Sequence, residues 1–177
     1  MTLTRQPHGS GTDFEAFVRA RSPALIRSAY LLTGDQQLAE DLVQSALART
    51  YRAWKRVERL GNAEAYTRRA MYHLQVSFWR RRRVREVYRE TLPEASVDPG
   101  TAEVPARRDA LRHALGQLTN RQRAVLVLRF YEDRSVAEAA ELLGCGTGTV
   151  KSQTAVALQR LRSEKFDLEQ FTERQLV

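Results

Sequence analysis

The sequence predicts an all-α protein made of two small helical domains, here called lobes, joined by a flexible linker. Apolar residues recur every three or four positions through most of the 177 residues, and no stretch shows the strict alternation of a half-buried strand. Glycine and proline are concentrated at the junctions between these periodic stretches. Since 42% of the residues are apolar, the chain can bury one ordinary core or two small ones.

The first lobe, residues 13–83, begins with an apolar stripe that starts at Phe14. Ser22 followed by Pro23 predicts the start of a helix, because serine caps helices well and proline is favoured at the first helical position. Gly34 predicts the end of that helix, since glycine is the usual residue just past a helical C-terminus.

Asp35 is expected to cap the second helix, which should run to about Trp54. This helix is apolar over most of its surface and keeps one polar strip, which is typical of a helix between neighbours or under a partner. The strip comprises Glu40, Asp41, Gln44, Ser45, Ala48 and Arg52. After a connection over 57–61, Asn62 can cap a third helix that reaches the arginines at 80–83.

The third helix has two arcs of different chemistry. Its predicted core arc holds Tyr66, Ala70, Met71, Leu74 and Phe78. The opposite arc, predicted to be exposed, holds Arg68, Arg69, Tyr72, Gln75, Trp79, Arg80 and Arg83, with His73 at its edge. Aromatic rings among arginines offer stacking surfaces beside phosphate charge, which favours binding to unpaired DNA. The alternative is that Trp79 is buried and the arginines are merely solvated.

Residues 84–105 are predicted to form the linker, because they combine three prolines and five acidic residues without a sustained period. Residues 1–12 are expected to be disordered, and residues 166–177 are assigned to a C-terminal tail.

In the second lobe, residues 106–165, two capping boxes predict helix starts. Thr119 with Gln122 opens a helix over 124–130, and Ser135 with Glu138 opens a short helix that ends at Leu143.

Gly144 then permits a tight turn before a last helix from about Thr147 to Arg162, whose Val150 packs it onto the preceding helix. This pattern predicts a helix-turn-helix that fits the major groove, although a plain helical hairpin is the alternative. The outward side chains are candidate DNA contacts: Thr149, Lys151, Ser152, Gln153, Val156 and Arg160. The single cysteine, Cys145, is interpreted as a small buried apolar residue.

Charge points to a polyanionic partner, because 29 basic and 21 acidic residues give a net charge of +8. Residues 1–83 alone carry +8, against −3 for 84–105 and +3 for 106–177. One cysteine and three scattered histidines argue against a disulfide, a metal site or a metal cofactor. With neither a signal peptide nor a membrane span in the sequence, we expect a cytoplasmic protein without a membrane partner.

Across residues 13–165 the sequence resembles the extracytoplasmic-function RNA polymerase sigma factors of the sigma-70 family, most closely a group from high-GC Gram-positive bacteria. The motif AEDLVQSALARTYRAW at 39–54 resembles the polymerase-binding helix of region two, and NAEAYTRRAMYHLQVSFWRRRR at 62–83 resembles its promoter-melting helix. Residues 118–153 resemble region four. The resemblance implies a non-catalytic protein that carries core polymerase to promoters.

The resemblance also implies roles for individual residues. Contacts to the β′ clamp helices of the polymerase would come from Asp41, Gln44, Ser45 and Ala48, and contacts to the β flap from Leu126, Leu128 and Phe130. The loop 57–62, with Arg59 and Asn62, would hold a base flipped from the minus ten element. Arg69, His73, Ser77 and Arg80 would face that element, joined by Arg68, Tyr72 and Trp79 from the exposed arc. Lys151, Ser152, Gln153 and Val156 would read the minus thirty-five element.

Three positions depart from the family's pattern: His73 stands where an asparagine is common, Gln153 where arginine is common, and Val156 where a basic residue is common. An anti-sigma factor is a further candidate partner that the sequence leaves open. Two other classes of protein fit the sequence less well. A stand-alone helix-turn-helix regulator would leave the arginine-rich helix without a role, and a nucleic-acid enzyme would need a catalytic constellation that the sequence lacks.

Overall fold

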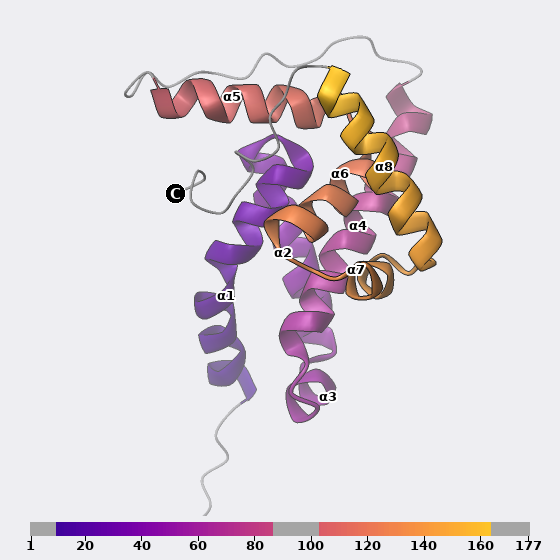
Figure 1. Cartoon of the computed structure of the whole chain (residues 1–177). Coiled ribbons are helices and arrows are strands. Elements are labelled where there is room, and N and C mark those ends of the chain that lie inside the picture. Colours follow the sequence, from indigo (N-terminus) through magenta and orange to yellow (C-terminus); the bar gives the residue numbers. More distant parts are fainter. Residues whose placement is uncertain (1–9, 87–102, 164–177) are drawn as a thin grey trace, which may run out of the picture.

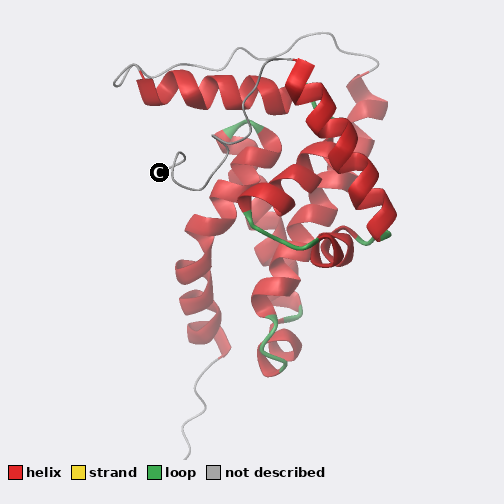
Figure 2. Ribbon diagram, in the orientation of Figure 1, coloured by secondary structure: helices red, strands yellow, loops and turns green. Residues whose placement is uncertain are grey.

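The computed structural model describes residues 10–86 and 103–163, and all the regular structure in these two segments is helical (Figure 2). The elements in chain order are α1 (Ser10–Thr33), α2 (Gln36–Arg52), α3 (Trp54–Arg59), α4 (Ala63–Glu86), α5 (Glu103–Gly116), α6 (Asn120–Leu126), the π-helical turn η1 (Val127–Tyr131), α7 (Val136–Leu143) and α8 (Thr147–Ser163). The all-α prediction is confirmed.

The first lobe is a bundle in which α2 packs against both α1 and α4 (Figure 1). Gly34 ends α1 with a φ of +73°, and the Asp35 side chain accepts a hydrogen bond from the Leu38 amide at 2.8 Å, so both predicted boundaries are confirmed. The small residues Ala29, Ala39 and Ala46 are fully buried, which lets the helices approach closely.

The predicted helix start at Ser22 and Pro23 is wrong, because α1 is one helix of 24 residues that runs through Pro23. Proline inside a helix lacks the amide that would bond the carbonyl four residues earlier, here that of Arg19. Both Pro23 and Arg19 are exposed, so water can satisfy that carbonyl, and the helix continues despite the missing bond.

The connection between the second and third predicted helices is also more regular than expected. α2 ends at Arg52, and residues 54–59 form the short helix α3, whose Val57 is 2% exposed. Only Leu60, Gly61 and Asn62 remain between α3 and α4, and Gly61 makes the turn with a φ of +64°.

Both predicted capping boxes of the second lobe are present. Thr119 and Gln122 exchange side-chain-to-backbone hydrogen bonds at the start of α6, as do Ser135 and Glu138 at the start of α7. The helix predicted over 124–130 changes into the wider turn η1 after Leu126.

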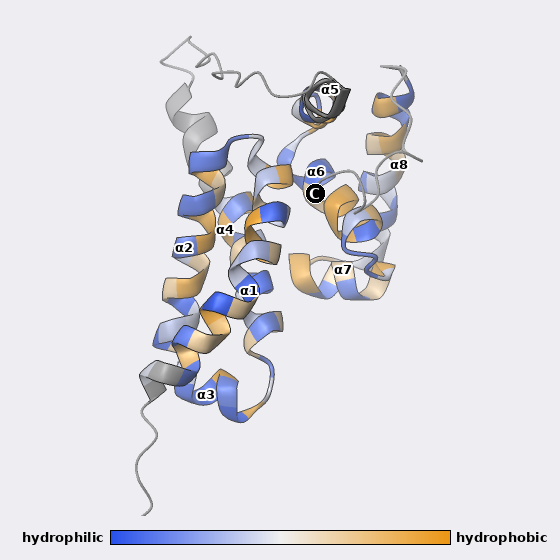
Figure 3. Ribbon diagram, turned by 90° about the vertical axis from the view of Figure 1, so that its left-hand side faces the viewer, coloured by the Kyte–Doolittle hydropathy of each residue, from blue (hydrophilic) through white to orange (hydrophobic). Residues whose placement is uncertain are grey.

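The two lobes pack against each other rather than standing apart. α1 contacts α6 and η1, while α4 contacts α6 and α7. Most of the buried apolar residues of both lobes form one continuous cluster, and Figure 3 shows an apolar (orange) end of α7 turned toward the first lobe. The sequence predicted the two lobes but not this contact.

Several predictions fall partly outside the described residues. Residues 1–9, 87–102 and 164–177 are not described, which covers most of the N-terminal segment, the linker and the tail. At the edges of these gaps, α1 already begins at Ser10, α4 continues to Glu86, and α5 starts at Glu103.

Candidate nucleic-acid interface

The arc of α4 that was predicted to be exposed is partly covered by the second lobe. Tyr72 is 0% exposed, and only 12% of the Arg68 side chain is accessible. The predicted exposure of these two side chains is therefore wrong. A helical wheel shows which residues share a face, but it does not show that a segment 60 residues later in the chain covers that face.

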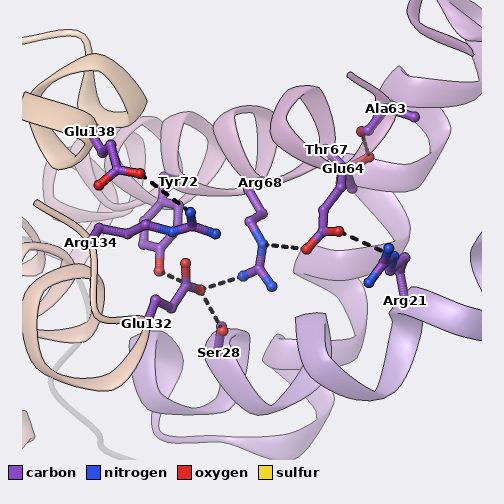
Figure 4. Close-up of polar contacts among 10 residues, drawn as sticks. All are labelled: Arg21, Ser28, Ala63, Glu64, Thr67, Arg68, Tyr72, Glu132, Arg134 and Glu138. Atoms are coloured by element: carbon purple, nitrogen blue, oxygen red, sulfur yellow. Dashed lines mark hydrogen bonds and ion pairs between the residues drawn. The ribbon is translucent and has the colours of Figure 1, made fainter. Parts of the chain in front are cut away.

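Glu132, which follows η1, lies at the centre of this contact (Figure 4). One of its carboxylate oxygens, Oε1, accepts hydrogen bonds from Arg68 Nη1 at 2.6 Å, from the Ser28 hydroxyl at 2.7 Å and from the Tyr72 hydroxyl at 3.0 Å. All three donors belong to the first lobe. Arg68 also pairs with Glu64, through its Nε at 3.1 Å.

The negative charge of Glu132 raises the pKa of both Tyr72 and Arg68. Burial raises the pKa of Tyr72 well above its usual value, and the negative charge of Glu132 raises it further. Burial by itself lowers the pKa of Arg68, but the charges of Glu132 and Glu64 outweigh this effect and raise it. The Arg68 guanidinium therefore stays positively charged within the contact.

Gln75 was also predicted to be exposed, and it is 2% exposed. Its side-chain amide donates to the Leu32 carbonyl at 2.9 Å, near the end of α1. Arg123 of α6 donates to the same carbonyl oxygen at 2.8 Å. Gln75 thus joins α4 to α1, and Arg123 joins the second lobe to the same carbonyl oxygen.

His73 is half-buried at the turn of the helix-turn-helix. A Cβ atom at Gly144 would lie 3.3 Å from its Nε2, so the ring packs directly against this glycine. Burial lowers the pKa of His73, and the neighbouring charge of Arg69 lowers it further.

Other candidate contacts to the minus ten element remain accessible. Arg69 and Ser77 are exposed on α4, and Arg59 and Asn62 are exposed beside the turn after α3. The predicted contacts Trp79 and Arg80 have side chains outside the described set, although the backbone of α4 runs through both.

In α8, the second helix of the helix-turn-helix, the residues predicted to face outward lie on the outer side. Gly144 adopts a φ of +64° between α7 and α8, and Val150, Ala157 and Leu161 are buried on the inner side of α8. On the outer side Lys151, Ser152, Val156 and Arg160 are exposed and Thr149 and Gln153 are half-buried. This geometry confirms the predicted helix-turn-helix and leaves the outer side of α8 open to solvent.

The polar strip of α2 is exposed as predicted at Asp41, Gln44, Ser45 and Ala48. Beside it lies a cleft of about 110 Å³, lined by Thr33, Leu38, Asp41, Leu42, Ser45, Leu74 and Gln75. The candidate polymerase contacts of the second lobe differ. Leu126 and Leu128 are 0% exposed in the core, and Phe130 is 40% exposed. Among these three, Phe130 alone can meet a partner in this conformation.

Sequence reasoning missed Ser28, Arg123 and Glu132, the residues that join the lobes on this face. No local pattern marks them, because each bonds to a residue 60 to 104 positions away. Within the described residues, no helix is long and apolar enough to cross a membrane, and no group of acidic, histidine or cysteine side chains could hold a metal ion.

Two family models match the chain, one for each lobe. Sigma-70 region 2 matches residues 17–85, and Sigma-70, region 4 matches residues 114–163. The second match contains the complete helix-turn-helix, and the first contains nearly all of α4 as well as α2 and α3.

Curated relatives match over most of their length. The RNA polymerase sigma-E factors of Streptomyces avermitilis and Streptomyces coelicolor are each 46% identical, over 89% and 88% of this chain and 87% and 88% of their own. The ECF RNA polymerase sigma factor SigL of Mycobacterium tuberculosis is 36% identical over 78% of this chain and 80% of its own.

A solved structure has the same arrangement of helices. The co-crystal structure of the sigma factor RpoE with the anti-sigma factor NepR from Bartonella quintana matches 85% of this chain and 95% of that chain, with a TM-score of 0.62 and 25% identity. From its two matched regions, its relatives and its fold, the chain belongs to the extracytoplasmic-function (ECF) RNA polymerase sigma factors of the sigma-70 family.

Proposed function

We propose that this alternative sigma factor binds core RNA polymerase through α2 and η1, reads the minus thirty-five element with α8, and captures the unpaired minus ten element with α4. The observation that carries the proposal is the open outer face of α8. It is held in a helix-turn-helix by Gly144, and it lies in a chain whose first lobe matches region 2.

The chemistry of α8 supports reading of duplex DNA. Lys151 and Arg160 supply positive charge for phosphates, and Ser152 and Gln153 can donate and accept hydrogen bonds at base edges. Val156 is 41% exposed, a solvent-facing apolar side chain suited to a thymine methyl group.

The chemistry of the first lobe supports capture of a separated strand. Arg69 and Ser77 on α4, together with Arg59 and Asn62 beside the turn, give an exposed basic and polar surface. Arg68, Tyr72, His73, Trp79 and Arg80 complete the proposed minus ten surface.

For the polymerase, we assign Asp41, Gln44, Ser45 and Ala48 to the β′ clamp helices, and Leu126, Leu128 and Phe130 to the β flap. The exposed strip on α2 supports the first assignment, and Phe130 supports the second. Leu126 and Leu128 are buried, so in this conformation they would contribute through the packing of the segment that carries Phe130.

The proposed role is that of a promoter-specificity subunit in the cytoplasm, with catalysis left to the polymerase. An anti-sigma factor is a candidate regulator, because the structural neighbour is a sigma factor bound to one. The helix-turn-helix regulator without a polymerase is not favoured, since the match to region 2 accounts for the first lobe.

The test is reconstitution with core polymerase on a promoter template that carries both elements. We expect a stable complex and specific transcripts from the purified chain. The paired variants are Asp41→Ala, which should weaken the complex, and Glu15→Ala, which removes an exposed carboxylate near the start of α1 and should leave the complex intact. Folded protein that gives neither complex nor transcript would overturn the proposal.

A further inference from the structure

We propose that Glu64 holds Arg21 of α1 and Arg68 of α4 side by side, so that the two guanidinium groups clamp one phosphate of the unpaired minus ten strand. This inference rests on the proposed function, because it takes α4 to capture that strand. It adds Arg21, which lies on a helix without an assigned DNA contact, and it makes Glu64 a positioning residue.

Glu64 lies in the first turn of α4 and joins two helices through its carboxylate. Its Oε1 accepts a hydrogen bond from Arg68 Nε at 3.1 Å, and its Oε2 lies 3.2 Å from Arg21 Nε. Figure 4 shows the Glu64 carboxylate between the two arginines. Because each oxygen holds a different guanidinium, one side chain fixes the positions of both.

The far ends of the two guanidinium groups are directed to other partners. Glu64 engages both arginines through Nε, the nitrogen next to the side-chain stem, so their Nη groups can bind a further anion. The Arg21 side chain is 52% exposed. The Nη1 of Arg68 already bonds a carboxylate oxygen, that of Glu132, at 2.6 Å. In the promoter complex a phosphate oxygen would take that place.

The clamp adjoins the proposed minus ten surface. Asn62, in the turn that would hold a flipped base, precedes Glu64 by two residues and is exposed, and Arg69, next to Arg68, is exposed on α4. A strand that runs from this turn along α4 therefore passes Glu64 and its two arginines. Positive groups that follow the backbone of such a strand are typical of single-strand binding sites.

The net charge of the three residues favours a phosphate, because two arginines and one glutamate leave one positive charge. Glu64 also orders two long side chains before the strand arrives, which reduces the entropy lost on binding. The alternative is that Glu64 only stabilises the fold, since a glutamate four residues before an arginine supports a helix by itself. The two explanations predict different signs: loss of a carboxylate alone favours DNA binding, whereas loss of the clamp weakens it.

The experiment measures binding of the holoenzyme, reconstituted from core polymerase and the full chain, to a fluorescent forked DNA whose minus ten strand is unpaired. Arg21→Ala should weaken binding about threefold or more, because it removes a charge-assisted contact to phosphate. It should also reduce the slope of log K against log salt by about 0.7, as expected for one phosphate on a single strand. The matched control is Arg19→Ala, an exposed arginine two residues away on α1, which should leave both quantities nearly unchanged.

Variants of Glu64 test its positioning role. Glu64→Ala should weaken binding to the forked DNA about twofold or more, although it removes a negative charge, because both arginines lose their support. Glu58→Ala removes an exposed carboxylate of α3 and should leave binding equal or tighter. Glu64→Gln keeps one oxygen acceptor for Arg68 and should lie between the wild-type chain and Glu64→Ala. Circular dichroism verifies that each variant is folded.

A series of forked DNAs, each with one neutral methylphosphonate linkage in the unpaired strand, identifies the phosphate. At one position the neutral linkage should weaken binding of the wild-type holoenzyme but have little further effect on Arg21→Ala, because the contact is already lost.

Three results would each overturn the clamp: Arg21→Ala binds like Arg19→Ala, Glu64→Ala binds as tightly as Glu58→Ala, or every neutral linkage weakens Arg21→Ala as much as the wild-type holoenzyme. A wild-type chain that transcribes but gives any of these results refutes the clamp and leaves the proposed function standing. Failure of the proposed function is recognised separately, because the folded wild-type chain then gives neither a polymerase complex nor a transcript.

Discussion

The hydroxyl oxygens of Thr50 and Thr67 lie 2.8 Å apart in the buried contact between α2 and α4. Each also lies within hydrogen-bond distance of a carbonyl oxygen on its own helix, Thr50 of Ala46 at 3.0 Å and Thr67 of Ala63 at 2.7 Å. The two hydroxyl protons are therefore shared among three hydrogen bonds. This pair links the two helices that carry the candidate polymerase and minus ten surfaces.

Replacing either threonine with valine should destabilise the fold by about 1 kcal/mol, because it removes a buried hydrogen bond at nearly constant volume. The double variant should cost less than the sum of the single ones, by roughly 0.5 kcal/mol or more, since the second change removes a partner that is already lost. Urea denaturation of the four proteins measures this coupling, and strictly additive losses would show that the hydroxyls do not interact.

Gly144→Ala should destabilise the second lobe by about 1 to 2 kcal/mol, because an L-residue is disfavoured at positive φ and the residue has a φ of +64°. The new methyl group would also press on His73. Gly146→Ala is the control from the same turn, since its Cβ would meet nothing within 4 Å. Thermal unfolding of both variants tests the difference, and equal losses would contradict the assigned cause.

Lys151→Ala should weaken binding to duplex DNA and reduce the slope of log K against log salt by about 1, as expected when one phosphate contact is lost. Lys55→Ala removes an exposed lysine of α3 and is the control. Fluorescence anisotropy with a duplex over a series of salt concentrations gives both slopes. An unchanged slope for Lys151→Ala would place this side chain away from phosphate.

Arg69→Ala should impair promoter opening more than duplex binding, because Arg69 lies on the exposed part of α4 rather than on α8. Permanganate reactivity of unpaired thymines measures opening, and anisotropy measures duplex binding. Arg19→Ala, an exposed arginine of α1, is the control. Equal losses in both assays from Arg69→Ala would argue against the division of labour between the lobes. The same test applies to Trp79.

Tyr72→Phe should cost about 1 kcal/mol at neutral pH through loss of its hydrogen bond to Glu132. The pKa of Tyr72 is raised in the folded chain, so its stabilising effect is complete below about pH 10 and declines above it, where the unfolded tyrosine ionises. The stability gap between the wild-type chain and Tyr72→Phe should therefore shrink as the pH rises from 9 to 11. Tyr51→Phe, at an exposed tyrosine, is the control for urea denaturation across this range.

Features set by neighbouring residues could be predicted from the sequence. Asp35, Ser135 and Gly144 mark helix boundaries through contacts within a few positions, so the helices and the helix-turn-helix follow from the local pattern. The helix start predicted at Pro23 was wrong, because a proline inside a helix is tolerated where water can reach the carbonyl that it leaves unpaired. Only the packed structure shows whether that carbonyl is exposed.

The burial of Tyr72 and Gln75 could not be predicted in this way. Both are polar side chains on the arc predicted to be exposed. Tyr72 is bonded to Glu132 of the second lobe, and Gln75 is bonded to the Leu32 carbonyl at the end of α1, which Arg123 of the second lobe also binds. The residues proposed to contact polymerase and DNA follow from the family resemblance, whereas the contacts between the lobes required the three-dimensional arrangement.

The shared carbonyl of Leu32 has a consequence for how the molecule melts. It accepts from Gln75 of the first lobe and Arg123 of the second, within an apolar cluster that also spans both lobes. If α1 unfolded, Gln75 of the first lobe and Arg123 of the second would both lose the hydrogen bond to this carbonyl. In the free chain, we therefore expect the two regions to unfold as one cooperative unit, although each belongs to a separate segment of the sequence.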